Sequence, residues 1–236
     1  MMEGGGAPVD ANKASSSTPE QSLPVACLLC MSGGCLDAFT WLSLGGVFAN
    51  SQTGNVVFLG MYSALGQWAK AAHHLPPILA FLVGAAIALR IKAPRLCLFG
   101  EILCLTAVYL MEKWMPGPLP IVAIAFGVAL QSASFRRVNR WTYLSVTVTS
   151  NMLRAVEQAL SAPDPDALRA VKTMLSLCLT FLFGAVAGGF ATVHLGAKGL
   201  IVPILLLTLA LALCRAHHAD SQLGIRLRKP RPGASD

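Results

Sequence analysis

Charged side chains are the scarcest feature of this 236-residue sequence, because Asp, Glu, Lys and Arg together make up only 12% of it. Soluble domains carry about twice that share. Apolar residues make up 55%, so a soluble fold would be unable to cover its surface with polar atoms. The same composition excludes a disordered regulator, since such chains are poor in apolar residues. The sequence therefore predicts an all-α polytopic membrane protein.

Motifs for catalysis and for cofactor binding are also lacking. The sequence contains no Gly-rich phosphate loop, nucleophile elbow or zinc signature. The pairs His73-His74 and His217-His218 have no further ligands at metal spacing, and we interpret them as surface residues. The seven cysteines are odd in number and lie in apolar segments, which excludes a secreted disulfide scaffold. We therefore expect no enzymatic activity, no cofactor and no metal site.

Positive charge is unevenly placed along the chain. The formal net charge is +7, and most of the 18 Lys and Arg residues lie in short clusters between apolar segments or in the last 22 residues. Such clusters hold loops on the cytoplasmic side of a membrane. We interpret them as topological signals and expect membrane lipid, not nucleic acid, as the partner.

Six strong apolar segments lie between two polar tails. Several are about 16 residues long, so they must extend into their flanks to span a bilayer. The six segments are 23–44, 75–89, 96–111, 119–135, 171–193 and 199–214. The first tail, 1–22, is rich in Gly, Ser and Pro and is predicted to be disordered, and the basic tail 215–236 is predicted to be loose and cytoplasmic.

Two further segments, 46–66 and 141–160, are ambiguous because polar residues occupy their centres. If both dip into the membrane and return, with the N-terminus cytoplasmic, 15 of the 18 Lys and Arg residues lie on the cytoplasmic side. If both cross fully, the split is 11 against 7. The positive-inside rule therefore favours six spans with both termini in the cytoplasm.

An internal repeat relates the two halves of the chain. Three short matches occur in the same order, at offsets that grow slowly from 94 to 100 residues. They pair Gly33–Ala38 with Gly127–Ser132, Thr53-Gly54-Asn55 with Thr149-Ser150-Asn151, and Phe81–Ala85 with Phe181–Ala185. The sequence thus predicts two three-helix membrane repeats, 23–112 and 117–214. Because three spans is an odd number, the second repeat must be inverted relative to the first.

Inverted repeats are typical of secondary transporters, which build their sites near the midplane from broken helices. The two ambiguous segments occupy the places where such breaks are expected. There, Gly54 would let the chain turn, and Thr53 or Asn55 would cap the helix that follows. Free N–H groups at a helix start favour an anion or a polar ligand atom. The predicted substrate-binding residues are Asp37, Thr53, Gly54, Asn55, Gln131, Thr149, Ser150 and Asn151.

Two acidic residues within apolar segments complete the set of candidates. Asp37 lies well inside the first span, and we expect it to be shielded from lipid and to contact the Thr53–Asn55 turn. It is either a protonatable coupling or ligand site or a structural hydrogen-bonding group. Its repeat counterpart, Gln131, is neutral. Glu101 lies six residues after Arg95, and we interpret it as an interfacial or locally paired carboxylate.

The run SGGCLDAFTWLSLGGVFANSQTGNVVFLG (32–60), together with Ala129–Ala133 and Val148–Asn151, resembles the YoaK-like bacterial integral membrane proteins. The resemblance covers about residues 24 to 214. It departs at Ser150, where that family more usually has a second T-G-N. The resemblance implies a location in the bacterial inner membrane, and it implies no substrate, because the family has no settled function.

Two function classes remain open at this point. One is a transporter or channel for a small polar, in particular anionic, solute. The other is a non-transporting membrane protein that binds a partner or stabilises an assembly. A water-accessible cavity that reaches Asp37 would favour the first class, and a sealed interior would favour the second.

Reporter fusions test the predicted topology. Fusions after residues 93, 115, 139 and 197 should report cytoplasmic, extracytoplasmic, cytoplasmic and extracytoplasmic locations in turn, since Lys and Arg clusters stay inside. Lys113 and Lys198 then face outward. An extracytoplasmic signal after residue 139 would contradict the six-span topology.

Overall fold

The computed structural model describes residues 19–138, 141–142, 148–161 and 165–228, and nearly all of them are helical. In chain order the elements are η1 (Pro19–Gln21), α1 (Leu23–Ser43), α2 (Gln52–Ala64), α3 (Trp68–His73), α4 (Leu75–Ile91), α5 (Pro94–Met111), η2 (Glu112–Trp114), α6 (Leu119–Ser134), β1 (Arg137–Val138), β2 (Trp141–Thr142), α7 (Val148–Leu160), α8 (Pro165–Leu195), η3 (Gly196–Leu200) and α9 (Ile201–Arg228). The all-α class is thus confirmed, apart from the two-residue strands β1 and β2, which pair antiparallel.

Long apolar helices dominate the described chain. Four stretches are long and apolar enough to cross a membrane, and the last of them contains both α8 and the apolar part of α9. These stretches are Leu23–Ser43, Trp68–Ile91, Pro94–Met111 and Pro165–Ala216. Helix α6 is equally apolar but shorter, at 16 residues. The prediction of a membrane protein with several apolar helices is therefore confirmed.

Proline opens five of these helices. Each of α1, α4, α5, α6 and α8 carries Pro at its first or second position. Proline fixes φ near the helical value and has no N–H group, so it removes a donor that would otherwise be unsatisfied at the helix start. This matters more in a membrane than in water, because lipid offers no hydrogen-bond acceptor.

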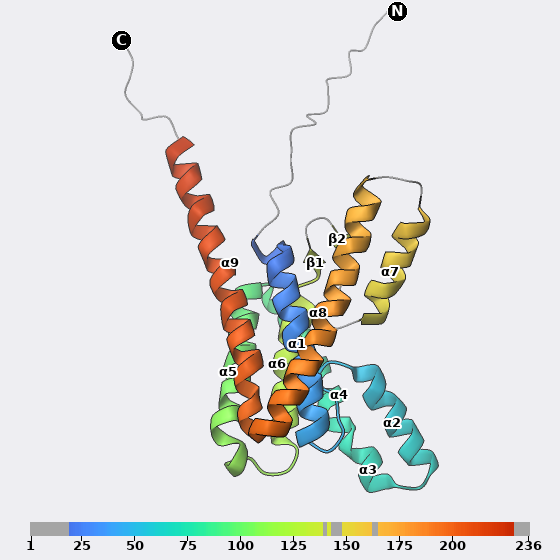
Figure 1. Cartoon of the computed structure of the whole chain (residues 1–236). Coiled ribbons are helices and arrows are strands. Elements are labelled where there is room, and N and C mark those ends of the chain that lie inside the picture. The colour runs from blue at the N-terminus through green and yellow to red at the C-terminus, as the bar shows by residue number, and fades with distance from the viewer. Residues whose placement is uncertain (1–18, 139–140, 143–147, 162–164, 229–236) are drawn as a thin grey trace, which may run out of the picture.

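The apolar helices α1, α4, α5, α6, α8 and α9 run alternately down and up the bundle (Figure 1). Helix α1 starts, and α9 ends, at the same end of the bundle. Helices α2 and α3 gather at the opposite end, whereas α7 and the β1–β2 hairpin lie toward the end where α1 starts. The two short helices α2 and α7 thus project from the same flank toward opposite ends.

Packing between the two halves of the chain is interleaved. Helix α1 packs against α8 and α9 from the second half, and α6 packs against α4 and α5 from the first half. The main buried cluster joins the two sets, through Leu36 on α1, Leu98 on α5, Ile124 on α6 and Leu207 on α9. The first apolar helix of each half, α1 or α6, therefore packs against two later helices of the other half.

Glycines allow α1 and α8 to approach backbone to backbone. A Cβ added to Gly184 would overlap the Met31 carbonyl, and one added to Gly188 would overlap the Cys35 backbone. From the other side, a Cβ on Gly34 would overlap the Phe181 carbonyl. Small residues at such contacts are the usual means of joining helices in membranes, where burial of apolar surface gives no advantage over lipid.

The terminal segments differ from the loose tails that the sequence predicted. Residues 1–18 and 229–236 lie outside the described residues, but Pro19–Gln21 forms η1, and Glu20 pairs with Arg95 at 2.7 Å. Helix α9 continues to Arg228. It can do so because residues 215–223 contain neither Pro nor Gly.

Adjacent glycines on α8 provide a matched test of the α1–α8 contact. Gly188→Ala should lower the free energy of unfolding by about 1–3 kcal/mol, since its Cβ would meet backbone that cannot move aside. Gly189→Ala should be neutral or slightly stabilising, because its Cβ would lie 4.0 Å from that of Ala38. Thermal melting of the purified variants in detergent measures both. Equal melting temperatures would show that the contact does not limit stability.

Candidate functional site

The chain folds back along α1 immediately after that helix ends. Gly45 and Gly46 have φ values of 81° and 79°, a conformation that other residues rarely adopt. The following segment runs back into the bundle until the Asn50 side chain donates to the Gly33 carbonyl at 2.9 Å. Helix α2 begins two residues later. The first ambiguous segment is thus a loop that returns alongside α1, followed by a helix that starts beside the middle of α1 (Figure 1).

Asp37 holds the end of this returning loop. Its Oδ1 accepts the Asn50 backbone N–H at 2.7 Å, and its Oδ2 accepts the Ser51 hydroxyl at 2.5 Å. The side chain is 5% exposed, which confirms the expected shielding. These donors offset the cost of burying a carboxyl group. Because Ser51 precedes α2, the carboxyl group of Asp37 also lies at the N-terminus of that helix, where negative charge is favoured.

Asn55 holds the middle of the same loop. Its Oδ1 accepts the Phe48 backbone N–H at 3.0 Å, and its Nδ2 donates to the Phe48 carbonyl at 2.7 Å. The side chain is completely buried. A single amide thus satisfies both backbone groups of one loop residue, as a neighbouring strand would.

The predicted contact between Asp37 and the Thr53–Asn55 turn is wrong. Asp37 binds Asn50 and Ser51 instead, because α2 begins at Gln52 and so includes the T-G-N sequence in its first turn. Thr53 is exposed, and Asn55 binds the loop rather than capping the helix. Gly54 is not a turn residue either, because it lies in the first turn of α2. Its lack of a side chain lets α2 approach Phe48, since a Cβ at this position would lie 2.8 Å from the Phe48 ring.

The interpretation of His73 and His74 as surface residues is also wrong. His74 is 3% exposed, and its Nδ1 lies 3.4 Å from Asn55 Oδ1. His73 Nε2 lies 2.9 Å from the Leu44 carbonyl, at the start of the returning loop. His74 is buried and His73 half-buried because α3 and α4 both pack against α2. Within the described residues, no group of three His, Cys, Asp or Glu side chains is placed to hold a metal ion.

Aromatic side chains fasten α2 to its neighbours. The Phe58 ring on α2 stacks against His74, with ring centroids 5.4 Å apart, and lies at the same distance from Trp41 on α1. Trp41 in turn stacks on Phe48, at 4.8 Å. Such pairs add about 0.5–1.5 kcal/mol each to the burial of their surface. The loop and α2 are therefore held from both sides.

In the second half, α7 starts beside the middle of α8. The Cys178 thiol on α8 donates to the Val148 carbonyl at 3.7 Å. Of the predicted site residues here, Gln131 and Asn151 are buried, at 1% and 2% exposure, while Thr149 is exposed and Ser150 is half-buried. Within the second ambiguous segment, residues 143–147 lie outside the described residues.

The starts of α2 and α7 converge on one stretch of α8. A Cβ placed on Gly33 would lie 3.5 Å from the Phe181 ring and 3.6 Å from Asn50 Nδ2, so the end of the returning loop lies next to Phe181. Cys178, which contacts Val148, precedes Phe181 by three residues, or about 4.5 Å along the helix. The two short helices thus begin about one helical turn apart and extend toward opposite ends of the bundle (Figure 1).

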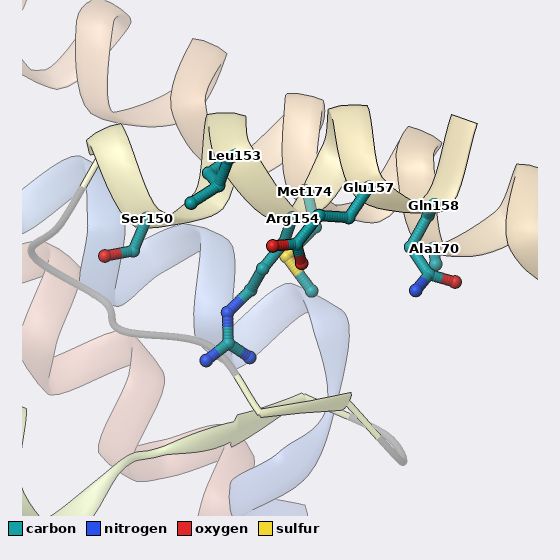
Figure 2. Close-up of a pocket in the computed structure, with 7 residues that line it drawn as sticks. All are labelled: Ser150, Leu153, Arg154, Glu157, Gln158, Ala170 and Met174. Carbon is teal, nitrogen blue, oxygen red and sulfur yellow. The ribbon is translucent and has the colours of Figure 1, made fainter. Parts of the chain in front are cut away.

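Two cavities adjoin these helix starts. The first, of about 420 Å³, reaches Asp37 and Ser51 but is otherwise lined by apolar groups such as Trp41, Phe48 and Phe181. The second, of about 380 Å³, lies between α7 and α8 and has a mixed polar and apolar lining. Figure 2 shows Arg154 of this lining reaching from α7 toward the β1–β2 hairpin. The polar residues that line the second cavity are Ser150, Arg154, Glu157 and Gln158.

Sequence reasoning missed the residues that bind Asp37 and Asn55. Asn50, Ser51 and Phe48 were outside the predicted site, although Asn50 and Ser51 belong to the polar run N-S-Q that precedes T-G-N. That run is the signal that could have found them, because buried polar residues next to a membrane carboxylate are its natural partners. The backbone contacts of Asn55 have no counterpart in any sequence pattern.

Glu101 also departs from its interpretation as an interfacial or locally paired carboxylate. It is completely buried on α5, and Arg95 pairs with Glu20 instead. The interpretation is wrong because Arg95 lies in the first turn of α5, beside η1, while Glu101 lies further along and faces α6.

Substitutions of Asp37 test its role as the anchor of the loop. Asp37→Leu leaves the Asn50 N–H and the Ser51 hydroxyl without an acceptor and should cost about 1–3 kcal/mol for each donor. Asp37→Asn keeps an acceptor for Asn50 and should melt close to the wild type. Thermal melting in detergent measures the difference, and equal melting of the two variants would contradict the anchoring role.

Comparison with known proteins gives one match. No curated protein and no solved structure matches the chain. A family model described as "Protein of unknown function (DUF1275)" matches residues 25–213, which cover every apolar helix described above. The YoaK-like resemblance is consistent with this match. The chain therefore belongs to the DUF1275 family of proteins of unknown function.

Proposed function

We propose that the protein moves a small polar solute across the bacterial inner membrane, as a transporter or channel without enzymatic activity. The solute site lies between two inverted repeats, where α2 and α7 begin. In this proposal both termini are cytoplasmic, as the distribution of Lys and Arg favours.

Six helices form the proposed membrane domain, namely α1, α4, α5, α6, α8 and α9. Two features support their division into inverted repeats. The helix contacts are the same in both halves when α1 is paired with α6, α4 with α8 and α5 with α9. Helix α1 packs against α8 and α9, and its counterpart α6 packs against α4 and α5. In addition, α2 and α7 point toward opposite ends of the bundle, as an axis in the membrane plane requires (Figure 1).

The convergence of the two short helices is the observation that carries the proposal. Both begin beside the middle of α8, next to buried polar side chains that include Asp37, Asn50 and Asn151. Irregular backbone and polar groups at membrane depth are tolerated where protein or a solute path covers them. Transporters of inverted-repeat construction place their sites at such breaks.

An unmet hydrogen-bond acceptor points to a polar solute. Asn50 is 4% exposed, and its Oδ1 has no hydrogen-bond partner among the described residues, although its Nδ2 and N–H are both engaged. A buried acceptor without a donor costs about 1–3 kcal/mol, which a donor on a solute or water would recover. A solute with an N–H or O–H group could meet this acceptor, as a water molecule could.

Charge differs between the two helix starts. The Asp37 carboxyl group lies at the start of α2, whereas its repeat counterpart Gln131 is neutral. The N–H groups at the start of α7 are therefore the better place for an anionic group of the solute. The groove that reaches Asp37 has an almost entirely apolar lining, so it does not by itself provide the water-accessible cavity expected of a transporter.

A binding screen followed by uptake tests this proposal. Small polar acids and their neutral analogues are screened by thermal shift on the purified chain, and each stabilising compound is then measured for uptake into proteoliposomes. Asp37→Asn and Asn151→Leu should each reduce uptake by about tenfold or more, because both lie at the converging helix starts. Thr208→Ala, on the exposed face of α9, is the matched control and should transport normally.

The outcomes separate the two function classes. Uptake that depends on Asp37 and Asn151 supports transport. Compounds that stabilise the protein but do not enter liposomes would overturn transport and favour a binding or assembly role.

A further inference from the structure

Glu101 is the most unusual buried group in the described part of the chain. It lies near the middle of α5, its exposed fraction is 0%, and neither carboxyl oxygen has a hydrogen-bond partner among the described residues. Asp37, by comparison, is held by Asn50 and Ser51. A carboxyl group without any donor differs from a structural anchor, and the function proposed above does not use it.

The surroundings of Glu101 are apolar and tightly closed. A Cβ placed on Gly127 of α6 would lie 3.2 Å from the Glu101 Cα, 3.3 Å from its Cγ and 3.3 Å from the Cys104 Cβ. The α5–α6 contact therefore closes over the side chain because residue 127 is glycine. An additional methyl group there would force the two helices apart.

No charged group among the described neighbours compensates Glu101. Helix α6 contains no titratable residue, and α9 has none before Cys214. Lys198 of η3 is exposed at the end of the bundle. On α5 itself the nearest titratable side chain is Cys104, which also borders Gly127. An ionised carboxylate in such a place would have neither a counter-ion nor a donor, so the group is held as the neutral acid.

We propose that Glu101 is a proton-binding site, which carries H⁺ while the α5–α6 contact is closed and releases it to water when the contact opens. The bound proton completes a neutral carboxyl group, and its departure leaves a carboxylate that water must stabilise. Release and closure are thus mutually exclusive. If the protein transports a solute as proposed above, this proton is the coupling ion, and that role depends on the transport proposal.

A neighbouring groove gives this contact a route to the lipid phase. The groove has a volume of about 760 Å³ and an almost entirely apolar lining from α4, α5 and α6, including Cys104 and Phe126. Cys104 borders Gly127 at this contact, and Phe126 directly precedes Gly127 in the sequence. An apolar reagent dissolved in the bilayer can therefore approach Glu101 without crossing the polar loop around Asp37.

Infrared spectroscopy of the full chain in lipid nanodiscs tests proton occupancy without any solute. The wild type at neutral pH should show the C=O stretch of a neutral carboxylic acid, which Glu101→Gln removes and the matched control Glu157→Gln, at an exposed position, retains. In D₂O this band should shift, since the site exchanges its proton. A wild-type spectrum that Glu101→Gln leaves unchanged would overturn the proposal, as would a band that never exchanges.

Labelling with dicyclohexylcarbodiimide, which reacts with neutral carboxylic acids in apolar places, provides a second readout. Mass spectrometry should locate the label on Glu101, with a rate that falls about tenfold per pH unit once the carboxylate predominates. Gly127→Ala, which retains Glu101 but widens the contact, should speed both labelling and exchange. This variant keeps the test decisive even where Glu101→Gln fails to fold. Unchanged rates in Gly127→Ala, or no labelling of Glu101, would count against the site.

The two proposals fail separately. Solute uptake with an inert Glu101 overturns the proton site alone. An exchanging and labelled Glu101 in a protein that transports no compound overturns the transport proposal and leaves the proton site standing, without its role in coupling.

Discussion

The hydrogen bonds that Asp37 accepts from Asn50 and Ser51 determine how the first half of the chain is built. Lipid offers no partners for backbone groups, so a chain that re-enters the bundle without helical structure must find them within the protein. Asp37 satisfies the end of the returning loop, and Asn55 satisfies both backbone groups of Phe48 in its middle. Together they stabilise the non-helical segment between α1 and α2 within the bundle.

Close helix contacts then fix where this loop lies relative to the second half. Glycines 34, 184 and 188 bring α1 and α8 into backbone contact, and this places Phe181 against Gly33 and Asn50. The end of the loop is consequently covered by α8 from the second half of the chain. The polar anchoring of the loop and the glycine packing between the halves thus depend on each other. The loop must be covered by α8, and α8 can cover it only because the glycines let α8 approach α1 closely.

The apolar segments, the break in the first half and the burial of Asp37 could be predicted from the sequence because hydropathy and charge placement report the membrane directly. The partners of Asp37 could not be predicted, because the T-G-N sequence is typical of a turn with a helix cap. In the structure Gly54 instead makes room for the Phe48 ring, and Asn55 binds the backbone of the loop. Glu101 and His74 were misjudged for the same reason. Local patterns describe what a residue does to its own element, whereas burial by a distant helix is set by tertiary packing.

The interleaved packing of the halves has a consequence for biogenesis. Helix α1 is synthesised first, yet α8 and α9, against which it packs, come last. The 121 residues between Ser43 and Pro165 take about 10 s to translate at about 10 residues per second. During that interval the glycine face of α1 has no partner from its own chain and meets lipid or the insertion machinery. The packing of α1 is therefore a late event, which begins only when α8 and α9 enter the membrane.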